Sequence, residues 1–301
     1  MKQLVCIALV GMLLSACGAN PSSSTNSGST VKQSDVSAPA EAPPAENPAA
    51  EPAAIWIPTP ELTWDWQLSS GANLNAEVQV FDIDLFGNSA ETVAAIHAKG
   101  AKAICYISVG TLEDWQADAA TFPQSVIGKP YDGWPGEYWL DIRQIDLLAP
   151  VMRARLDMCR DKGFDGFEPD NIDGFYADTG FPLTAEDELR YVRWLANEAH
   201  QRGLSMGLKN VPDFAAELVD ELDWALTEDC LADGWCDQMK PFIDANKAVF
   251  MAEYTDRGTT VQQMCPAAKA LRFSPVLKNR DLGIERQGCE GQARYLPLIR
   301  S

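Results

Sequence analysis

Short apolar segments that each end in polar residues recur along the chain from residue 64 onward. They predict eight strands, at residues 64–68, 78–84, 103–108, 164–170, 204–210, 224–228, 249–254 and 271–278. Between several of them lie amphipathic stretches that end in a cation and then a glycine, at Gly100, Gly163 and Gly203. This is a typical helix end, because the cation favours the helix dipole and glycine adopts the left-handed backbone. We therefore expect an α/β fold, a (β/α)8 TIM barrel, rather than an open doubly wound sheet, for which no Gly-rich phosphate turn is present.

Local signals also place two of the helices. Thr184 caps the run 185–199 with Asp187 three residues later, and the run carries apolar residues at helical spacing. Residues 143–159 show the same spacing. Two stretches depart from the alternation, since the link 69–77 is too short for a full helix and residues 109–147 form a long insert.

The first 54 residues predict export and a tether rather than a folded domain. Lys2 is followed by an apolar run at residues 4–14 that is too short to span a membrane, which is typical of a signal peptide. The next residues read LSAC and resemble a bacterial lipobox, which implies a signal peptide at residues 1–16 and a lipid on Cys17. The alternative is an ordinary signal peptide that is cut near Ala19.

Residues 17–54 are rich in Ser, Pro and Ala and predict a disordered tether, which leaves residues 55–301 as the folded domain. We expect a membrane-anchored lipoprotein that faces the periplasm or the cell surface.

Six cysteines remain once Cys6 leaves with the signal peptide and Cys17 takes the lipid. An even number in an exported domain indicates disulfides rather than metal ligands. Many pairings of six cysteines are possible. The preferred set joins Cys230 to Cys236 across one short loop and pairs the two C-terminal cysteines, which leaves the first two for each other. The candidates are Cys105, Cys159, Cys230, Cys236, Cys265 and Cys289.

The charge excludes one class of function. The chain has 24 Lys and Arg against 43 Asp and Glu, a net charge of −19. It therefore lacks the basic surface that nucleic acid requires, and we expect no nucleic-acid partner. The two histidines, His97 and His200, fall in the last turns of predicted helices, far from the strand ends. We expect no metal and no cofactor, and a monomer.

Carboxylates dominate the positions where the predicted strands end. In a TIM barrel these positions face the active site. Several carboxyl groups with Tyr, Asn and Lys between them suit glycoside hydrolysis, in which one carboxyl protonates the leaving oxygen and a second acts as nucleophile or base. The alternative is that these acids are only solvated or paired with lysines. Four loop tryptophans either stack on sugar rings or anchor their loops: Trp115, Trp134, Trp139 and Trp235.

The segment 164–175, FDGFEPDNIDGF, is similar to the signature of glycoside hydrolase family 114, the endo-α-1,4-polygalactosaminidases. The resemblance continues through residues 64–68, 103–110, 136–142, 207–210, 227–230 and 252–254. It implies a (β/α)8 fold and endo-cleavage of α-1,4-linked galactosamine or N-acetylgalactosamine polymers of biofilm matrix. It also points to Asp170 and Glu228 as the catalytic pair. Asp229 stands where many members of the family have Gln.

The candidate substrate-binding residues are Asp82, Asp84, Tyr106, Asp141, Glu168, Asn171, Asp173, Lys209, Asn210, Glu253 and Tyr254. We assign Glu228 as general acid and Asp170 as nucleophile or base. Partly deacetylated galactosamine polymers are cationic, so an acidic domain attracts them.

Two other functions are possible at this point. One is a non-catalytic cell-surface barrel that binds glycan. The other is a metal-dependent deacetylase, which the lack of histidine at the strand ends disfavours.

Overall fold

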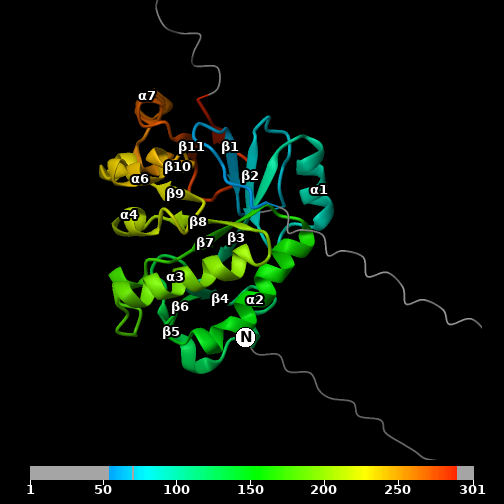
Figure 1. The fold of residues 1–301 in the computed structure, drawn as a ribbon, viewed down its shortest axis with the longest axis vertical. Coiled ribbons are helices and arrows are strands. Elements are labelled where there is room, and N and C mark those ends of the chain that lie inside the picture. The colour runs from blue at the N-terminus through cyan, green and yellow to red at the C-terminus, as the bar shows by residue number, and fades with distance from the viewer. Residues whose placement is uncertain (1–53, 70, 290–301) are drawn as a thin grey trace, which may run out of the picture. The chain divides into compact units, whose positions relative to one another are not determined.

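The computed structural model describes residues 54–69 and 71–289 (Figure 1). The predicted signal peptide, Cys17 and most of the predicted tether lie outside these residues. None of the helices in the described ranges is both long enough and apolar enough to cross a bilayer.

Eight parallel strands form the barrel, and they coincide with the eight predicted segments. They are β1 (Trp64–Gln67), β2 (Val80–Asp84), β3 (Lys102–Ser108), β7 (Gly166–Asp170), β8 (Ser205–Lys209), β9 (Trp224–Glu228), β10 (Val249–Tyr254) and β11 (Ser274–Lys278). Each pairs with the next in chain order, and the short β12 (Arg286–Gln287) runs antiparallel to β11. The predicted (β/α)8 barrel is confirmed.

Side chains join β1 to β11 where the barrel closes. The Trp64 indole donates to the carbonyl oxygen of Ser274 at 2.8 Å, and Lys278 Nζ lies 2.9 Å from Asp65 Oδ1. All four residues are buried. The first and last parallel strands are thus held together without solvent between them.

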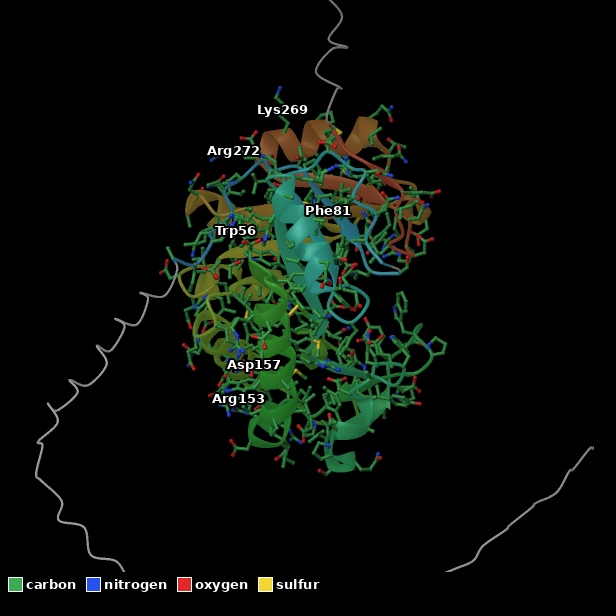
Figure 2. The ribbon with its side chains drawn as sticks, turned by 90° about the vertical axis from the view of Figure 1, so that its right-hand side faces the viewer. Trp56, Phe81, Arg153, Asp157, Lys269 and Arg272 are labelled. Atoms are coloured by element: carbon green, nitrogen blue, oxygen red, sulfur yellow. A yellow bond between two sulfur atoms is a disulfide. The ribbon has the colours of Figure 1, made fainter. Side chains whose placement is uncertain are left out.

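Helices cover the outside of the barrel. They are α1 (Ala90–Ala98), α2 (Ile145–Lys162), α3 (Ala185–His200), α4 (Ala215–Leu218), α5 (Cys230–Asp233), α6 (Lys240–Asp244) and α7 (Val261–Leu271). Single 3₁₀ turns occur at Ala119–Thr121, Gln124–Val126, Gly174–Tyr176, Pro212–Phe214, Cys236–Met239 and Thr255–Arg257. Figure 2 looks onto α1 and α2, with Arg153 and Asp157 of α2 on the outer surface.

The predicted helix signals are borne out. Thr184 and Asp187 form a reciprocal capping box at the start of α3. Gly100, Gly163 and Gly203 all have positive φ, at 77°, 90° and 76°, so each chain reversal uses a conformation that glycine adopts at little cost.

Both histidines lie at the N-terminal ends of the barrel strands, on the side away from the cleft. His97 Nε2 is 2.7 Å from Asp165 Oδ2, and His200 Nε2 is 2.8 Å from Asp223 Oδ2. These aspartates directly precede β7 and β9, at the opposite end from the mouth of the barrel.

The insert between β3 and α2 folds as a small antiparallel sheet. Its strands are β4 (Thr111–Glu113), β5 (Ile127–Pro130) and β6 (Glu137–Leu140), in the order β4-β6-β5. Gly110 allows the insert to leave β3 close to the barrel, because a Cβ there would lie 1.6 Å from the carbonyl oxygen of Asn171. The insert therefore stands directly beside the end of β7.

Large apolar side chains fill the interior of the barrel below the C-terminal ends of its strands. Trp64, Trp66, Trp224 and Phe250 are all at most 1% exposed. Gly207 makes room for Trp224, since a Cβ at this position would come within 2.5 Å of the indole ring. This packing leaves the space at the C-terminal ends of the strands for the polar side chains of a site.

Three disulfides are present in the described ranges, and they are the three preferred pairs. Cys105–Cys159 ties β3 to α2, Cys230–Cys236 closes the loop after β9, and Cys265–Cys289 ties α7 to the chain beyond β12. Each links an outer helix or loop to another part of the same domain.

Candidate active site

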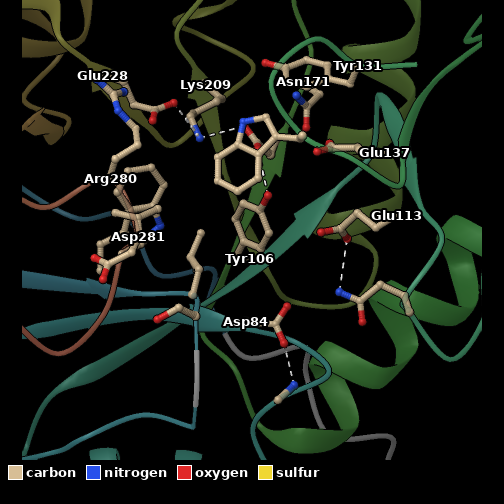
Figure 3. A pocket seen from close by; sticks show the side chains of 18 of the residues that line it. Asp84, Tyr106, Glu113, Tyr131, Glu137, Asn171, Lys209, Glu228, Arg280 and Asp281 are labelled. Carbon is tan, nitrogen blue, oxygen red and sulfur yellow. Dashed lines mark hydrogen bonds and ion pairs between the residues drawn. The ribbon is translucent and has the colours of Figure 1, made fainter. Parts of the chain in front are cut away.

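A cleft of about 720 Å³ opens at the C-terminal ends of the strands (Figure 3). The ends of the barrel strands form its floor, the insert forms one wall, and the loop after β11 forms the opposite wall. The acidic, basic and aromatic residues that line it are Trp66, Asp84, Phe86, Tyr106, Glu113, Trp115, Tyr131, Trp134, Glu137, Asp170, Asp173, Lys209, Glu228, Tyr254, Arg280 and Asp281.

Strand alternation decides which side chains enter the cleft. Leu226 and Ala252 belong to the barrel interior, so the residues two positions later, Glu228 and Tyr254, point to the same side. By the same rule Lys209 follows the inward-facing Gly207. The strand ends thus collect their polar groups around one central space.

Lys209 lies at the centre of these groups. Its Nζ is 2.7 Å from Glu168 Oε1, 2.8 Å from Asp170 Oδ1 and 3.3 Å from Glu228 Oε2, and its side chain is 2% exposed. Burial alone lowers the pKa of Lys209, but the charges of the three carboxylates outweigh it and raise the pKa well above its usual value. Lys209 is therefore an ammonium ion throughout the physiological pH range.

Asp170 and Glu228 are held by matched donors. Tyr106 Oη donates to Asp170 Oδ2 at 2.7 Å, and Tyr254 Oη donates to Glu228 Oε1 at 2.5 Å. Both carboxylates still reach the cleft, with side chains 20% and 24% exposed. Each is thus fixed in orientation and open to a substrate.

The residues that follow Asp170, Lys209 and Glu228 each turn the chain sharply. Asn171, Asn210 and Asp229 have φ of 61°, 61° and 53°, a left-handed conformation that Asn and Asp tolerate better than other non-glycine residues. Asn210 also bonds Glu228 twice, since its Nδ2 donates to Glu228 Oε2 at 2.9 Å and its Oδ1 accepts from the Glu228 N–H at 2.8 Å. The turn therefore also orients the carboxylate.

Comparison with known proteins identifies this arrangement. The family model for glycoside hydrolase family GH114 matches residues 45–294. The chain belongs to family GH114. It is a glycoside hydrolase, and the cleft at the mouth of its barrel is the candidate active site.

Solved structures agree with this assignment. The crystal structure of Aspergillus fumigatus Ega3 in complex with galactosamine has 37% sequence identity and a TM-score of 0.75, over 79% of this chain and 98% of that one. The glycoside hydrolase domain of PelA from Pseudomonas aeruginosa shares the fold, with 14% identity and a TM-score of 0.59 over 75% of this chain and 98% of that one. No curated protein matches this chain.

Two predicted residues of this GH114 hydrolase lie beneath the cleft rather than in it. Glu168 accepts hydrogen bonds from the Trp66 indole and from Lys209, and Asp82 lies beside it, fully buried. Burial raises the pKa of Asp82 well above its usual value, with the charge of Glu168 adding to the effect. Burial also raises the pKa of Glu168 to about 7. Glu168 supports Lys209 from below, and neither residue lines the cleft.

Asp84 and Asp173 do line the cleft, as predicted. Burial raises the pKa of both, that of Asp173 to about 6 with a contribution from the charge of Asp170. The predicted residues that the structure brings to the cleft are Asp84, Tyr106, Asp170, Asn171, Asp173, Lys209, Asn210, Glu228 and Tyr254.

The structure places Asp141 and Glu253, which the sequence predicts as substrate-binding residues, outside the cleft. Asp141 accepts two hydrogen bonds from Arg143, at 2.7 and 2.9 Å. Glu253 lies between two inward-facing residues of β10 and therefore points outward, where it accepts the N–H of Leu231 at 2.8 Å and caps α5. The sulfur atoms of the Cys230–Cys236 disulfide also lie near it, but a disulfide does not offer metal ligands.

Several residues that line the cleft of this protein were not predicted from the sequence. Glu113 and Tyr131 come from the insert, and Arg280 and Asp281 from the loop after β11. Glu137 lies inside the segment 136–142 that carried the family resemblance, so a signal for it was present. The others have no local signal, because the insert and the loop after β11 take their positions only against the barrel.

Arg280 explains the departure at Asp229. Its guanidinium stacks on the Tyr254 ring, 3.6 Å from the centroid, and pairs with Asp229 Oδ2 at 2.9 Å. Asp229 thus fixes Arg280 against the tyrosine that holds Glu228.

Of the four tryptophans predicted in loops, two line the cleft and two pack into the core. Trp115 and Trp134 line the cleft and are 53% and 48% exposed. Trp139 is buried and Trp235 packs against the core, so these two anchor their loops.

Proposed function

We propose that this GH114 hydrolase cleaves α-1,4-linked galactosamine or N-acetylgalactosamine polymers, of the kind that biofilm exopolysaccharides contain, at internal bonds. Family membership and the galactosamine bound by the 37% identical Ega3 support this substrate class. The charge supports it too, because an acidic cleft in a protein of net charge −19 attracts a cationic polymer.

One observation carries the assignment of the catalytic pair. Asp170 and Glu228 reach the cleft from β7 and β9 and contact the same ammonium group of Lys209. Asp170 has the closer contact with this cation, at 2.8 Å, and we assign it as the nucleophile or base. Glu228, whose contact with the same ammonium group is longer, at 3.3 Å, is then the general acid.

The separation of the two carboxyl groups sets the stereochemical outcome, with ~5–5.5 Å in retaining enzymes and ~6.5–9.5 Å in inverting ones. Both carboxylates touch Lys209 Nζ, so their two contacting oxygens are at most about 6 Å apart, a bound that falls between the two ranges. In a retaining reaction Asp170 would form a covalent glycosyl intermediate that water hydrolyses. NMR of the first-formed product distinguishes the two outcomes by its anomer.

Release of reducing ends from purified galactosamine polymers of graded acetylation tests the function. We expect new ends to appear with the intact chain length falling early, as internal cleavage requires. Saturable retention of the polymer without new ends would instead indicate a glycan-binding protein.

We further propose that the protein is exported and held at a membrane through a lipid on Cys17. The lipobox-like LSAC sequence supports this, and so do three disulfides, which form in oxidising compartments.

A further inference from the structure

We propose that Glu113 and Glu137 form a subsite that binds the ammonium group of a deacetylated galactosamine unit beside the catalytic pair. This inference rests on the proposed function and adds which sugar the cleft selects. Both residues belong to the insert and line its wall of the cleft, across from Arg280 and Asp281 (Figure 3).

The two glutamates lie directly opposite each other on paired strands. Glu113 of β4 is in register with Glu137 of the antiparallel β6. Like charges at directly opposed positions destabilise a sheet. A pair that served only the fold would gain nothing from this arrangement, which indicates that it serves a ligand.

Neither glutamate has a cation of its own within the described ranges. Glu113 is 7% exposed and accepts one hydrogen bond, from Gln116 Nε2 at 3.2 Å, while Glu137 is 6% exposed and accepts one from the Thr111 hydroxyl. No Lys or Arg of residues 54–69 and 71–289 forms a salt bridge with either one. One oxygen of each carboxyl group is therefore left for a donor that enters the cleft.

The electrostatics favour a cationic donor over a neutral one. Burial raises the pKa of both groups to about 7, and for Glu113 the charge of Glu137 adds to the effect. A bound ammonium ion would relieve the repulsion and hold both groups as carboxylates through charge-assisted hydrogen bonds. A hydroxyl or an N-acetyl group carries no charge and provides no such compensation.

The position of the pair ties it to the reacting bond. Thr111 Oγ1 donates to Glu137 and also lies 3.3 Å from Asn171 Oδ1, in the residue that follows Asp170. On the same insert, Trp115 and Trp134 expose about half of their surface to solvent in the cleft, where a sugar ring can stack. The insert thus supplies both an aromatic surface and an anionic site for one amino sugar.

Isosteric variants test the proposal. In an Asp170→Asn background, which binds without turnover, Glu113→Gln and Glu137→Gln should each weaken binding of fully deacetylated galactosamine oligomers by about 10- to 100-fold. Binding of fully N-acetylated oligomers should change by less than about 2-fold. The thermal midpoint should stay the same or rise, because each variant removes the repulsion between opposed carboxylates.

Asp114→Asn is the matched control, since it makes the same change of charge at the neighbouring exposed position of the insert. It should leave both affinities unchanged. Equal losses for both oligomers, or no loss for either, would overturn the ammonium subsite while leaving hydrolysis intact. Absence of cleavage of every galactosamine polymer by the wild-type protein would instead reject the proposed function.

Discussion

Asp170 and Glu228 contact one ammonium group, with Lys209 Nζ 2.8 Å from Asp170 Oδ1 and 3.3 Å from Glu228 Oε2. The cation compensates two carboxylates that would otherwise repel each other in a partly dry cleft. It also couples them, so that a change at one carboxylate alters the field at the other.

Asp170→Asn and Glu228→Gln should each lower kcat by at least about 10²–10⁴-fold. Both variants keep the shape of the side chain and the contacts of Lys209 with Glu168, so the thermal midpoint and polymer binding should be nearly unchanged. A reducing-end assay together with a melting curve measures both. Near-normal hydrolysis by either variant would move the chemistry to another carboxylate that lines the cleft, Glu137 or Asp173.

Tyr254→Phe and Tyr106→Phe should each lower kcat. Tyr254 donates to Glu228 and Tyr106 donates to Asp170, so each variant removes a hydrogen bond that fixes the orientation of one catalytic carboxylate. A hydrogen bond to a charged group contributes enough for a loss of about 10- to 100-fold in kcat, measured as release of reducing ends. Unchanged kcat in both variants would show that these tyrosines do not orient the catalytic pair.

Glu188→Gln should stabilise the protein at alkaline pH. Glu188 on α3 is 1% exposed, and burial raises its pKa from 4.5 to about 8. Between these values the folded state holds a proton that the unfolded state releases, so the free energy of unfolding falls as the pH rises from about 4.5 to about 8.

The variant removes this dependence and should raise the free energy of unfolding at pH 8 by about 1 kcal/mol or more. Urea titrations at pH 5 and pH 8 measure it. Glu186→Gln, at an exposed position of the same helix, is the control and should leave the difference between the two pH values unchanged.

Ionic strength should separate cationic from neutral substrates. If the acidic domain recruits the polymer by long-range attraction, the KM for deacetylated chains should rise between low and physiological salt, where the screening length shortens to ~8 Å. Fully N-acetylated chains should respond little. Equal dependence on salt for both would show that electrostatic attraction does not recruit the polymer.

Cys17→Ser should leave an uncleaved, unlipidated precursor if the lipobox-like sequence is processed as proposed. Metabolic labelling with a fatty acid and gel mobility measure this. Normal cleavage of the variant with unchanged membrane association would contradict the lipid anchor and favour the ordinary signal peptide.

The sequence alone determined the barrel and most of its mouth. The eight strands, the glycine stops of three helices and the capping box at Thr184 depend on periodicity and on local hydrogen bonds, which neighbouring residues specify. Asp170, Lys209 and Glu228 could be found for the same reason, because parallel strands bring their C-terminal ends to one edge whatever their lateral contacts are.

The direction in which a side chain points was harder to predict where a strand is buried on both faces. All six residues of β10 are buried, so its sequence shows no alternation from which the outward direction of Glu253 could be inferred. Asp141 directly follows β6, a strand of the insert. The rule that residues at the C-terminal ends of barrel strands face the active site does not apply to it.

Only the tertiary structure decided the two walls of the cleft. Glu113 and Glu137 are 24 residues apart in sequence and become neighbours through the register of β4 and β6. Arg280 reaches Tyr254 because β11 pairs in parallel with β10, which brings the loop after β11 beside the end of β10. Pairings between distant segments depend on loop closure and register, which the local propensities of either segment do not specify.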